Sequence, residues 1–401
     1  MTEKTEDFIF KPIDPIINPN LFGHKSNEQL FLSSIKSDHC HHAWLLSGIK
    51  GIGKFTFACR VARFIFSTIP DVQNEPMRFW NVQKSTNNFT DGFNFDDSNN
   101  ENIDEQSFID TKVTSNFISR KNIDTLQIDN NDIFNKIKLG TFSDLKIISP
   151  DIANNKKEIA IDDIRKIYDF FHVSSSMHDY RIIIIDSIDD LNNNSANALL
   201  KILEEPPKKT IFFLICHNIN NILDTIKSRT RILNFSPLKD ELVERLLYDN
   251  ITNINNNLVQ NLVYLSSGSI GTAYDLYNAD VNSIINDMKL ILTDLLNWKV
   301  KNLINFASGL QRGYKFYAFK KLILAIINSV VKFNMGVLDI KSLNLNIQEI
   351  INIVSSCYNK NVESVIKLKA DIENMFYKHD EINLDSESVI ILILNMLLRR
   401  Y

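Results

Sequence analysis

The stretch LLSGIKGIGKFTFACR, residues 45–60, decides the fold class of this chain. An apolar run ends at Gly48, a glycine-rich loop follows, and from Lys54 onward the apolar residues keep to one face of a helix. Gly48, Gly53 and Lys54 have the spacing of a loop whose backbone N–H groups converge on phosphate oxygens while the lysine adds a point charge. We therefore predict phosphate contacts from Gly48, Gly51, Gly53 and Lys54. A glycine turn with a surface lysine is the alternative.

The residue after the lysine departs from this pattern. That position normally supplies a hydroxyl to Mg²⁺, but this chain has Phe55, which cannot bind a metal. Thr56 follows about 100° further round the helix. We include Thr56 among the nucleotide-binding residues, and we leave Mg²⁺ binding open.

Further apolar runs predict a parallel sheet. Strands are expected within 42–48, 144–150, 181–191, 210–218 and 230–235, and helical patterns lie between them. The run RIIIID, residues 181–186, is continuously branched and apolar, as in a strand that is buried on both faces. We predict a doubly wound α/β domain, which residues 236–401 follow with helical patterns only.

Two charged residues at the predicted strand ends are candidates for chemistry. Asp186 ends the apolar run and is placed to hold the water shell of a metal ion, although a solvated strand-end carboxylate is the simpler alternative. We expect Asp189 and Asp190 to complement a helix N-terminus. Arg229, just before the last strand, can stabilise phosphoryl transfer in a neighbouring subunit or form a surface ion pair.

Composition excludes several classes of protein. The net charge of -4 indicates no general attraction to nucleic acid or acidic membranes. The four cysteines lie far apart, which argues against a disulfide framework or a zinc cluster. No apolar run reaches the roughly 18 residues of a membrane span, and the first residues lack an apolar signal core. We expect a cytoplasmic protein with no membrane contact.

The order of these motifs resembles the bacterial clamp-loader subunits of the DNA polymerase III holoenzyme, which are AAA+ proteins. NALLKILEEPP, residues 197–207, lies between the aspartate-ended strand and the later Ser228–Arg229 pair, and GSIGTAYDL, residues 268–276, resembles the lid motif. Residues 18–65 look most similar to the delta-prime type found in alphaproteobacteria. The resemblance implies an AAA+ P-loop domain at 1–235 with an Asn-rich insertion at about 70–135, a helical lid at 236–280 and a helical collar domain at 281–401.

The resemblance also implies a function, and the departures from the family pattern limit it. Ser187 stands where hydrolytic relatives have a glutamate, Thr272 where active loaders have a lid arginine, and no cysteine lies between Cys59 and Cys216 to form the zinc module of many relatives. We therefore expect a degenerate site for ATP, weak or absent ATPase activity, no zinc and no polymerase site of its own.

The resemblance implies that the catalytic contribution of this chain is Arg229, which it offers in trans to the ATP site of an adjacent subunit. The resemblance places it in a hetero-pentameric ring that loads the sliding clamp on primed DNA during replication. A self-sufficient AAA+ ATPase of the motor type and a purely structural scaffold are the alternatives.

Overall fold

The computed structural model describes residues 12–18, 20–36, 40–68, 132–150, 158–172, 180–296, 301–311 and 313–399. The chain divides into two compact units. The α/β unit comprises Asp14–Gly48 and Gly53–Phe235, and the helical unit includes Ile49–Ile52 and Ser236–Tyr401. The separate lid and collar domains remain predictions.

The α/β unit contains the predicted parallel sheet. Its five strands have the order β2-β3-β4-β1-β5, and every neighbouring pair is parallel. The strand bounds lie inside the predicted runs: β1 Ala43–Ser47, β2 Leu145–Ile148, β3 Arg181–Asp186, β4 Thr210–Cys216 and β5 Arg231–Asn234. The crossovers carry helices, since parallel strands cannot be joined by tight turns. This confirms the doubly wound α/β class.

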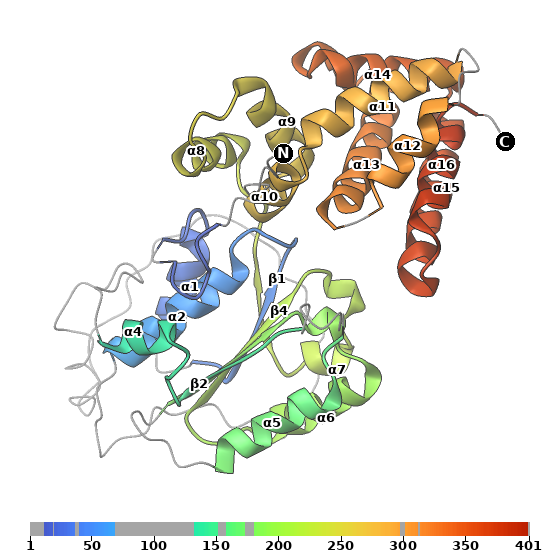
Figure 1. The fold of residues 1–401 in the computed structure, drawn as a ribbon. Coiled ribbons are helices and arrows are strands. Elements are labelled where there is room, and N and C mark those ends of the chain that lie inside the picture. Colours follow the sequence, from blue (N-terminus) through green and yellow to red (C-terminus); the bar gives the residue numbers. More distant parts are fainter. Residues whose placement is uncertain are drawn as a thin grey trace, which may run out of the picture. The chain divides into compact units, whose positions relative to one another are not determined.

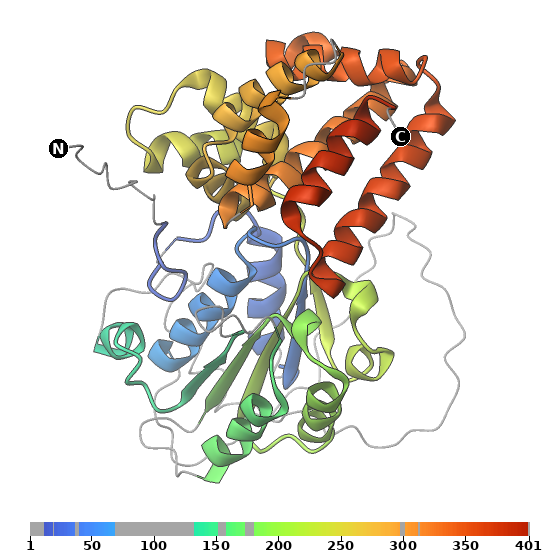
Figure 2. The same ribbon diagram turned by 45° about the vertical axis from the view of Figure 1, so that its right-hand side comes forward.

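Helices cover both faces of the sheet (Figures 1 and 2). One face carries α1 Lys25–Lys36, α2 Lys54–Thr68 and α4 Asp132–Lys138, and the other carries α5 Ile161–His172, α6 Asn193–Glu204 and α7 Asp224–Lys227. Successive side chains of β1 point to opposite faces of the sheet and so contact different helices. Trp44 packs edge-on against Phe31 of α1, whereas Leu45 joins the cluster that Ile167 and Leu199 of α5 and α6 complete.

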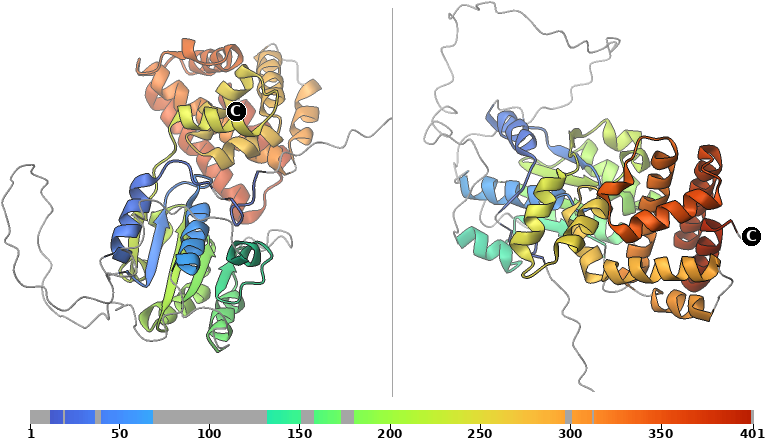
Figure 3. Two further views of the ribbon diagram at one scale, coloured as in Figure 1. Left: turned by 90° about the vertical axis from the view of Figure 1, so that its left-hand side faces the viewer. Right: turned by 90° about the horizontal axis from the view of Figure 1, so that it is seen from above.

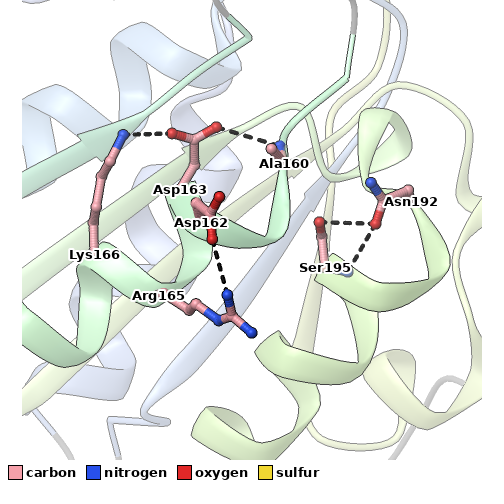
Figure 4. Close-up of polar contacts among 7 residues, drawn as sticks. All are labelled: Ala160, Asp162, Asp163, Arg165, Lys166, Asn192 and Ser195. Carbon is pink, nitrogen blue, oxygen red and sulfur yellow. Dashed lines mark hydrogen bonds and ion pairs between the residues drawn. The ribbon is translucent and has the colours of Figure 1, made fainter.

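The helices that follow β2 and β3 begin with side-chain caps (Figure 4). Asp163 accepts a hydrogen bond from the Ala160 N–H at 3.3 Å at the start of α5. Asn192 accepts from the Ser195 N–H at 2.9 Å at the start of α6, and the Ser195 hydroxyl donates to the Ile159 carbonyl. These bonds satisfy helix-terminal groups that have no partner within the helix. The start of α6 is thereby tied to the segment before α5.

The predicted insertion lies largely outside the described residues. Its last residues are described, because α4 begins at Asp132, inside the predicted range of about 70–135. Ile137 of α4 is buried, and α4 packs on α2.

The described part of the helical unit consists of helices and turns (Figure 3). One continuous apolar core extends from Leu238 to Leu398. Half of the residues of the last helix are buried against its neighbours, while Leu392 is 50% exposed. None of the described helices is long and apolar enough to cross a membrane. The α-helices of this unit are α8 Asp240–Asn250, α9 Asn256–Ser266, α10 Ile270–Asn278, α11 Val281–Leu296, α12 Lys301–Gly309, α13 Tyr314–Asn334, α14 Leu345–Cys357, α15 Val362–Ile382 and α16 Ser386–Leu397.

Candidate functional site

The predicted phosphate loop joins the end of β1 to the start of α2. The φ angles of Gly48, Gly51 and Gly53 are 151°, 81° and 101°, values that residues with a Cβ rarely adopt. The Gly48 N–H donates to the Cys216 carbonyl at 3.2 Å, which fastens the start of the loop to the end of β4. Backbone conformation therefore requires glycine at the three predicted positions, whereas their contact with a nucleotide remains a prediction.

Lys54, the first residue of α2, turns its side chain back over the loop. The residue is only 3% exposed, and its Nζ donates to the Gly48 carbonyl. Its charge also acts on Cys216 at the end of β4. The ammonium group thus lies at the loop, where a phosphate would meet it, and not on the outer surface as the alternative prediction had it.

The two residues after Lys54 differ in burial. Phe55 is half-buried and Thr56 is buried within α2, with 8% of its surface exposed. A phenyl ring provides no ligand for a cation, so the residues present at this point of the loop do not fit the usual Mg²⁺ contact. The predicted roles of Thr56 in nucleotide binding and of Mg²⁺ as cofactor stay predictions.

Asp186 is half-buried at the end of β3. Its register partner is Ile215 of β4, and Ser47 of β1 pairs with Cys216. The carboxylate-bearing strand end is therefore two strands from the start of the phosphate loop, which is about 10 Å. Asp186 also faces α2 closely enough to act on the Cys59 thiol, whose pKa burial raises to about 12. This places Asp186 on the same edge of the sheet as the loop.

Asp189 has a structural role that sequence reasoning missed. It lies in the short helix η2 Ile188–Asp190, and its carboxylate accepts the N–H groups of His217 at 2.6 Å and Asn218 at 2.8 Å. It thereby holds the turn after β3 against the end of β4. Burial, aided by the charge of Asp189, raises the pKa of the Cys216 thiol to about 12. No local pattern in the sequence marks a bond across 28 residues.

The tip of the phosphate loop is bonded within the helical unit, to the turn between α9 and α10. The Ser269 hydroxyl donates to the Lys50 carbonyl at 2.7 Å, and the Gly271 N–H donates to the Gly51 carbonyl at 2.9 Å. A Cβ on Gly271 would lie 2.8 Å from the Gly51 Cα, so the two backbones touch. Two loop carbonyls therefore accept hydrogen bonds from the segment that resembles the lid motif.

The position of the missing lid arginine is buried. Thr272 is 5% exposed and its hydroxyl lies 3.5 Å from the Tyr317 hydroxyl of α13. Lys50 at the loop tip acts on two charged groups nearby: it opposes the burial that raises the pKa of Asp275, and it adds to the burial that lowers the pKa of Lys321.

Arg229 lies in the turn between α7 and β5 and is partly exposed. Its Nη2 is 2.9 Å from Glu204 Oε1, and its Nη1 donates to the Thr225 carbonyl at 3.0 Å and to the Ser228 hydroxyl at 3.3 Å. Its side chain is 35% exposed and that of Glu204 is 50% exposed. The expected ion pair therefore exists, and the guanidinium group still reaches solvent.

The described residues define the class of protein: a doubly wound α/β domain with a glycine-rich loop after β1, followed by a helical region. The family model described as "DNA polymerase III, delta subunit" matches residues 72–239. The delta' subunits of Bacillus subtilis and Pseudomonas aeruginosa are 34% and 32% identical to this chain over 114 and 147 residues. These matches cover 28% and 35% of this chain, and 33% and 43% of the relatives.

A longer match is to the DNA polymerase III subunit gamma of Buchnera aphidicola subsp. Schizaphis graminum, 26% identical over 62% of this chain and 54% of that protein. A gamma subunit-related protein from Thermotoga maritima is a solved structure with 21% identity, 66% of this chain and 88% of that chain covered, and a TM-score of 0.31. The chain is therefore similar in sequence to DNA polymerase III delta' and gamma subunits. It matches less than half the length of the delta' relatives named above.

Proposed function

We propose that this chain is a clamp-loader subunit of the delta-prime type that presents Arg229 to ATP bound in a neighbouring subunit. The observation that carries the proposal is the state of Arg229. It stands at an exposed turn before β5, and contacts from its own chain hold it there while part of its surface stays open. An arginine supplied in trans can stabilise the charge that develops on the transferred phosphoryl group, with an effect of about 10³–10⁵ on the rate.

The chain's own phosphate loop is poorly equipped for ATP hydrolysis. Its glycines and Lys54 suit phosphate oxygens, but Phe55 replaces the hydroxyl residue and Ser187 is a poor base. The loop tip is also bonded to Ser269 and Gly271. ATP therefore remains a candidate ligand of a degenerate site, with no hydrolytic step assigned to this chain, and Mg²⁺ and the absence of zinc stay predictions.

The partners follow from the same proposal. Similarity to DNA polymerase III subunits supports a complex with other replication subunits. The finer proposal is a hetero-pentameric ring that acts on the sliding clamp and primed DNA. Each of these contacts is proposed for the assembled ring.

The test is ATP hydrolysis by the reconstituted loader with and without primed DNA. Arg229→Ala should lower hydrolysis at the neighbouring site by about 10³–10⁵, so total turnover falls by that site's share. Arg165→Ala is the matched control, because Arg165 is another exposed arginine of the α/β unit, paired with Asp162 at 2.9 Å.

Two results would contradict the proposal. Unchanged DNA-stimulated hydrolysis with Arg229→Ala, in a complex that still assembles, would favour a structural scaffold. Clear turnover by the isolated chain that Lys54→Ala abolishes would favour a self-sufficient ATPase.

A further inference from the structure

Glu204 occupies an unfavourable place for a carboxylate. It is the last residue of α6, and Glu205 follows as the C-cap before two prolines. The C-terminus of a helix carries partial negative charge, so acidic side chains there are disfavoured. Departures from such local rules are expected at functional sites, where another interaction offsets them. For Glu204 that interaction is the ion pair with Arg229.

The helix that carries Glu204 is firmly placed. Its start is capped by Asn192 and tied to Ile159 through Ser195, as Figure 4 shows for the cap. Its apolar side is buried on the sheet, with Leu199 at 0% and Leu203 at 2% exposure. The carboxylate of Glu204 thus projects from a rigid element, which is what accurate positioning of a partner requires.

Arg229 is held from two directions. Glu204 of α6 contacts Nη2, while the Thr225 carbonyl and the Ser228 hydroxyl receive hydrogen bonds from Nη1. A guanidinium group has five N–H donors. Within the described part of the chain, its polar partners are the two acceptors that Nη1 bonds and the Glu204 carboxylate, which pairs with Nη2 by charge. The N–H of Nε is left for an anion, and Nη2 donates no hydrogen bond to a described residue.

We propose that Glu204 is a positioning residue for Arg229: it fixes the Nη2 side of the guanidinium group, so that the remaining donors face outward toward a phosphate of the neighbouring subunit. This inference rests on the proposed function. An ion pair between groups this exposed contributes little to stability. Its main effect is therefore on where the guanidinium group lies.

The opposite role is physically reasonable and gives the opposite sign. If Glu204 were a competitor, its carboxylate would retain Arg229 on its own chain, and a triphosphate would have to displace it. Removing the carboxylate would then raise hydrolysis. The positioning role predicts that hydrolysis falls.

The experiment compares Glu204→Ala, Glu204→Gln and Arg229→Ala in the reconstituted loader, with ATP and primed DNA as the probes. The measured quantity is the Arg229-dependent activity, defined as the activity that Arg229→Ala removes. Glu205→Ala is the matched control: it removes the neighbouring carboxylate, which has no polar side-chain contact among the described residues. Thermal unfolding and assembly of the complex are measured alongside.

Glu204→Ala should lower kcat of the Arg229-dependent activity about tenfold and leave the KM for ATP unchanged. A misplacement of about 1 Å can cost about 10²-fold, and the Thr225 and Ser228 contacts retain part of the geometry. Glu204→Gln should recover part of the loss, because its amide oxygen keeps a polar acceptor beside Nη2, although the opposite charge is gone. Combining Glu204→Ala with Arg229→Ala should add nothing.

The outcomes separate the two proposals. If Arg229→Ala has no effect, the proposed function fails. If Arg229→Ala lowers hydrolysis, the proposed function stands. The positioning role of Glu204 is then wrong if Glu204→Ala leaves hydrolysis unchanged, raises it, or lowers it no more than the control Glu205→Ala.

Discussion

Substituting Gly271 with alanine tests the contact between the phosphate loop and the α9–α10 turn. Gly271 lies in α10 and its φ is outside the left-handed region, so its backbone accepts an alanine without strain. The added Cβ would lie 2.8 Å from the Gly51 Cα and 3.3 Å from the Gly51 carbonyl oxygen. Both atoms belong to backbone, which cannot turn aside as the end of a flexible side chain can.

The size of the effect follows from these distances. Carbon atoms pack at about 3.5–4.0 Å, so the two segments must separate by about 0.7 Å or more. The same movement would stretch the 2.9 Å bond from the Gly271 N–H to the Gly51 carbonyl to about 3.6 Å, beyond hydrogen-bond range. Overpacking costs about 1–3 kcal/mol and a lost hydrogen bond about 1 kcal/mol, whereas glycine to alanine in a helix returns at most about 1 kcal/mol. A net loss of about 1–3 kcal/mol is expected.

Gly309→Ala is the matched control. Gly309 ends α12, its φ is also ordinary, and a Cβ there meets nothing within 4 Å. The same chemical change should therefore be neutral or stabilise by up to about 1 kcal/mol. The difference between the two variants isolates the close approach of Gly51 and Gly271 from helix propensity.

Hydrogen exchange and thermal unfolding provide the assay. In Gly271→Ala, the amide of residue 271 and the amides of the loop at 49–54 should exchange about five to 150 times faster, as the expected loss of about 1–3 kcal/mol implies. The unfolding midpoint should fall below that of Gly309→Ala. Equal midpoints and equal exchange in the two variants would refute the close contact.

Three further predictions concern the α/β unit. Arg60→Ala should lower the free energy of unfolding in urea by about 3–5 kcal/mol, because it removes the ion-pair partner of Glu28, whose buried carboxylate lies 3.2 Å from the guanidinium group. The control Arg165→Ala, at an exposed ion pair, should cost under about 1 kcal/mol. Equal losses in the two variants would contradict this prediction. Asp189→Asn should cost about 2 kcal/mol, since two backbone N–H groups lose a charged acceptor, and an unchanged urea midpoint would disprove it. Burial lowers the pKa of His42 from 6.5 to about 4, so the unfolded chain binds more protons between these values and the free energy of unfolding should fall as the pH drops through that window. His42→Gln should flatten this pH dependence, and an identical slope in the variant would assign it to other groups.

Much of the α/β unit could be predicted from local patterns. A buried strand shows as a branched apolar run, and residues 181–186 formed β3 over that range. The helix α6 ends at Glu204, just before two prolines, which cannot continue a helix. The loop was predicted from the spacing of its glycines, and their positive φ angles explain why glycine stands at these positions. These features depend on residues that are close together in the chain, which is why the sequence reveals them.

The partners across the chain were decided by tertiary structure. Ser269 is hydrogen-bonded to Lys50, 219 positions away in the sequence, and Arg229 forms an ion pair with Glu204 of α6. Asp189 was expected to serve a helix end, yet its carboxylate also binds the backbone that follows β4. The sequence by itself determined the order of strands and helices and the glycine-rich loop, because steric and periodic preferences act locally. Only the folded chain determined which polar groups those elements bring within hydrogen-bond distance, because that depends on the packing of the whole sheet and its helices.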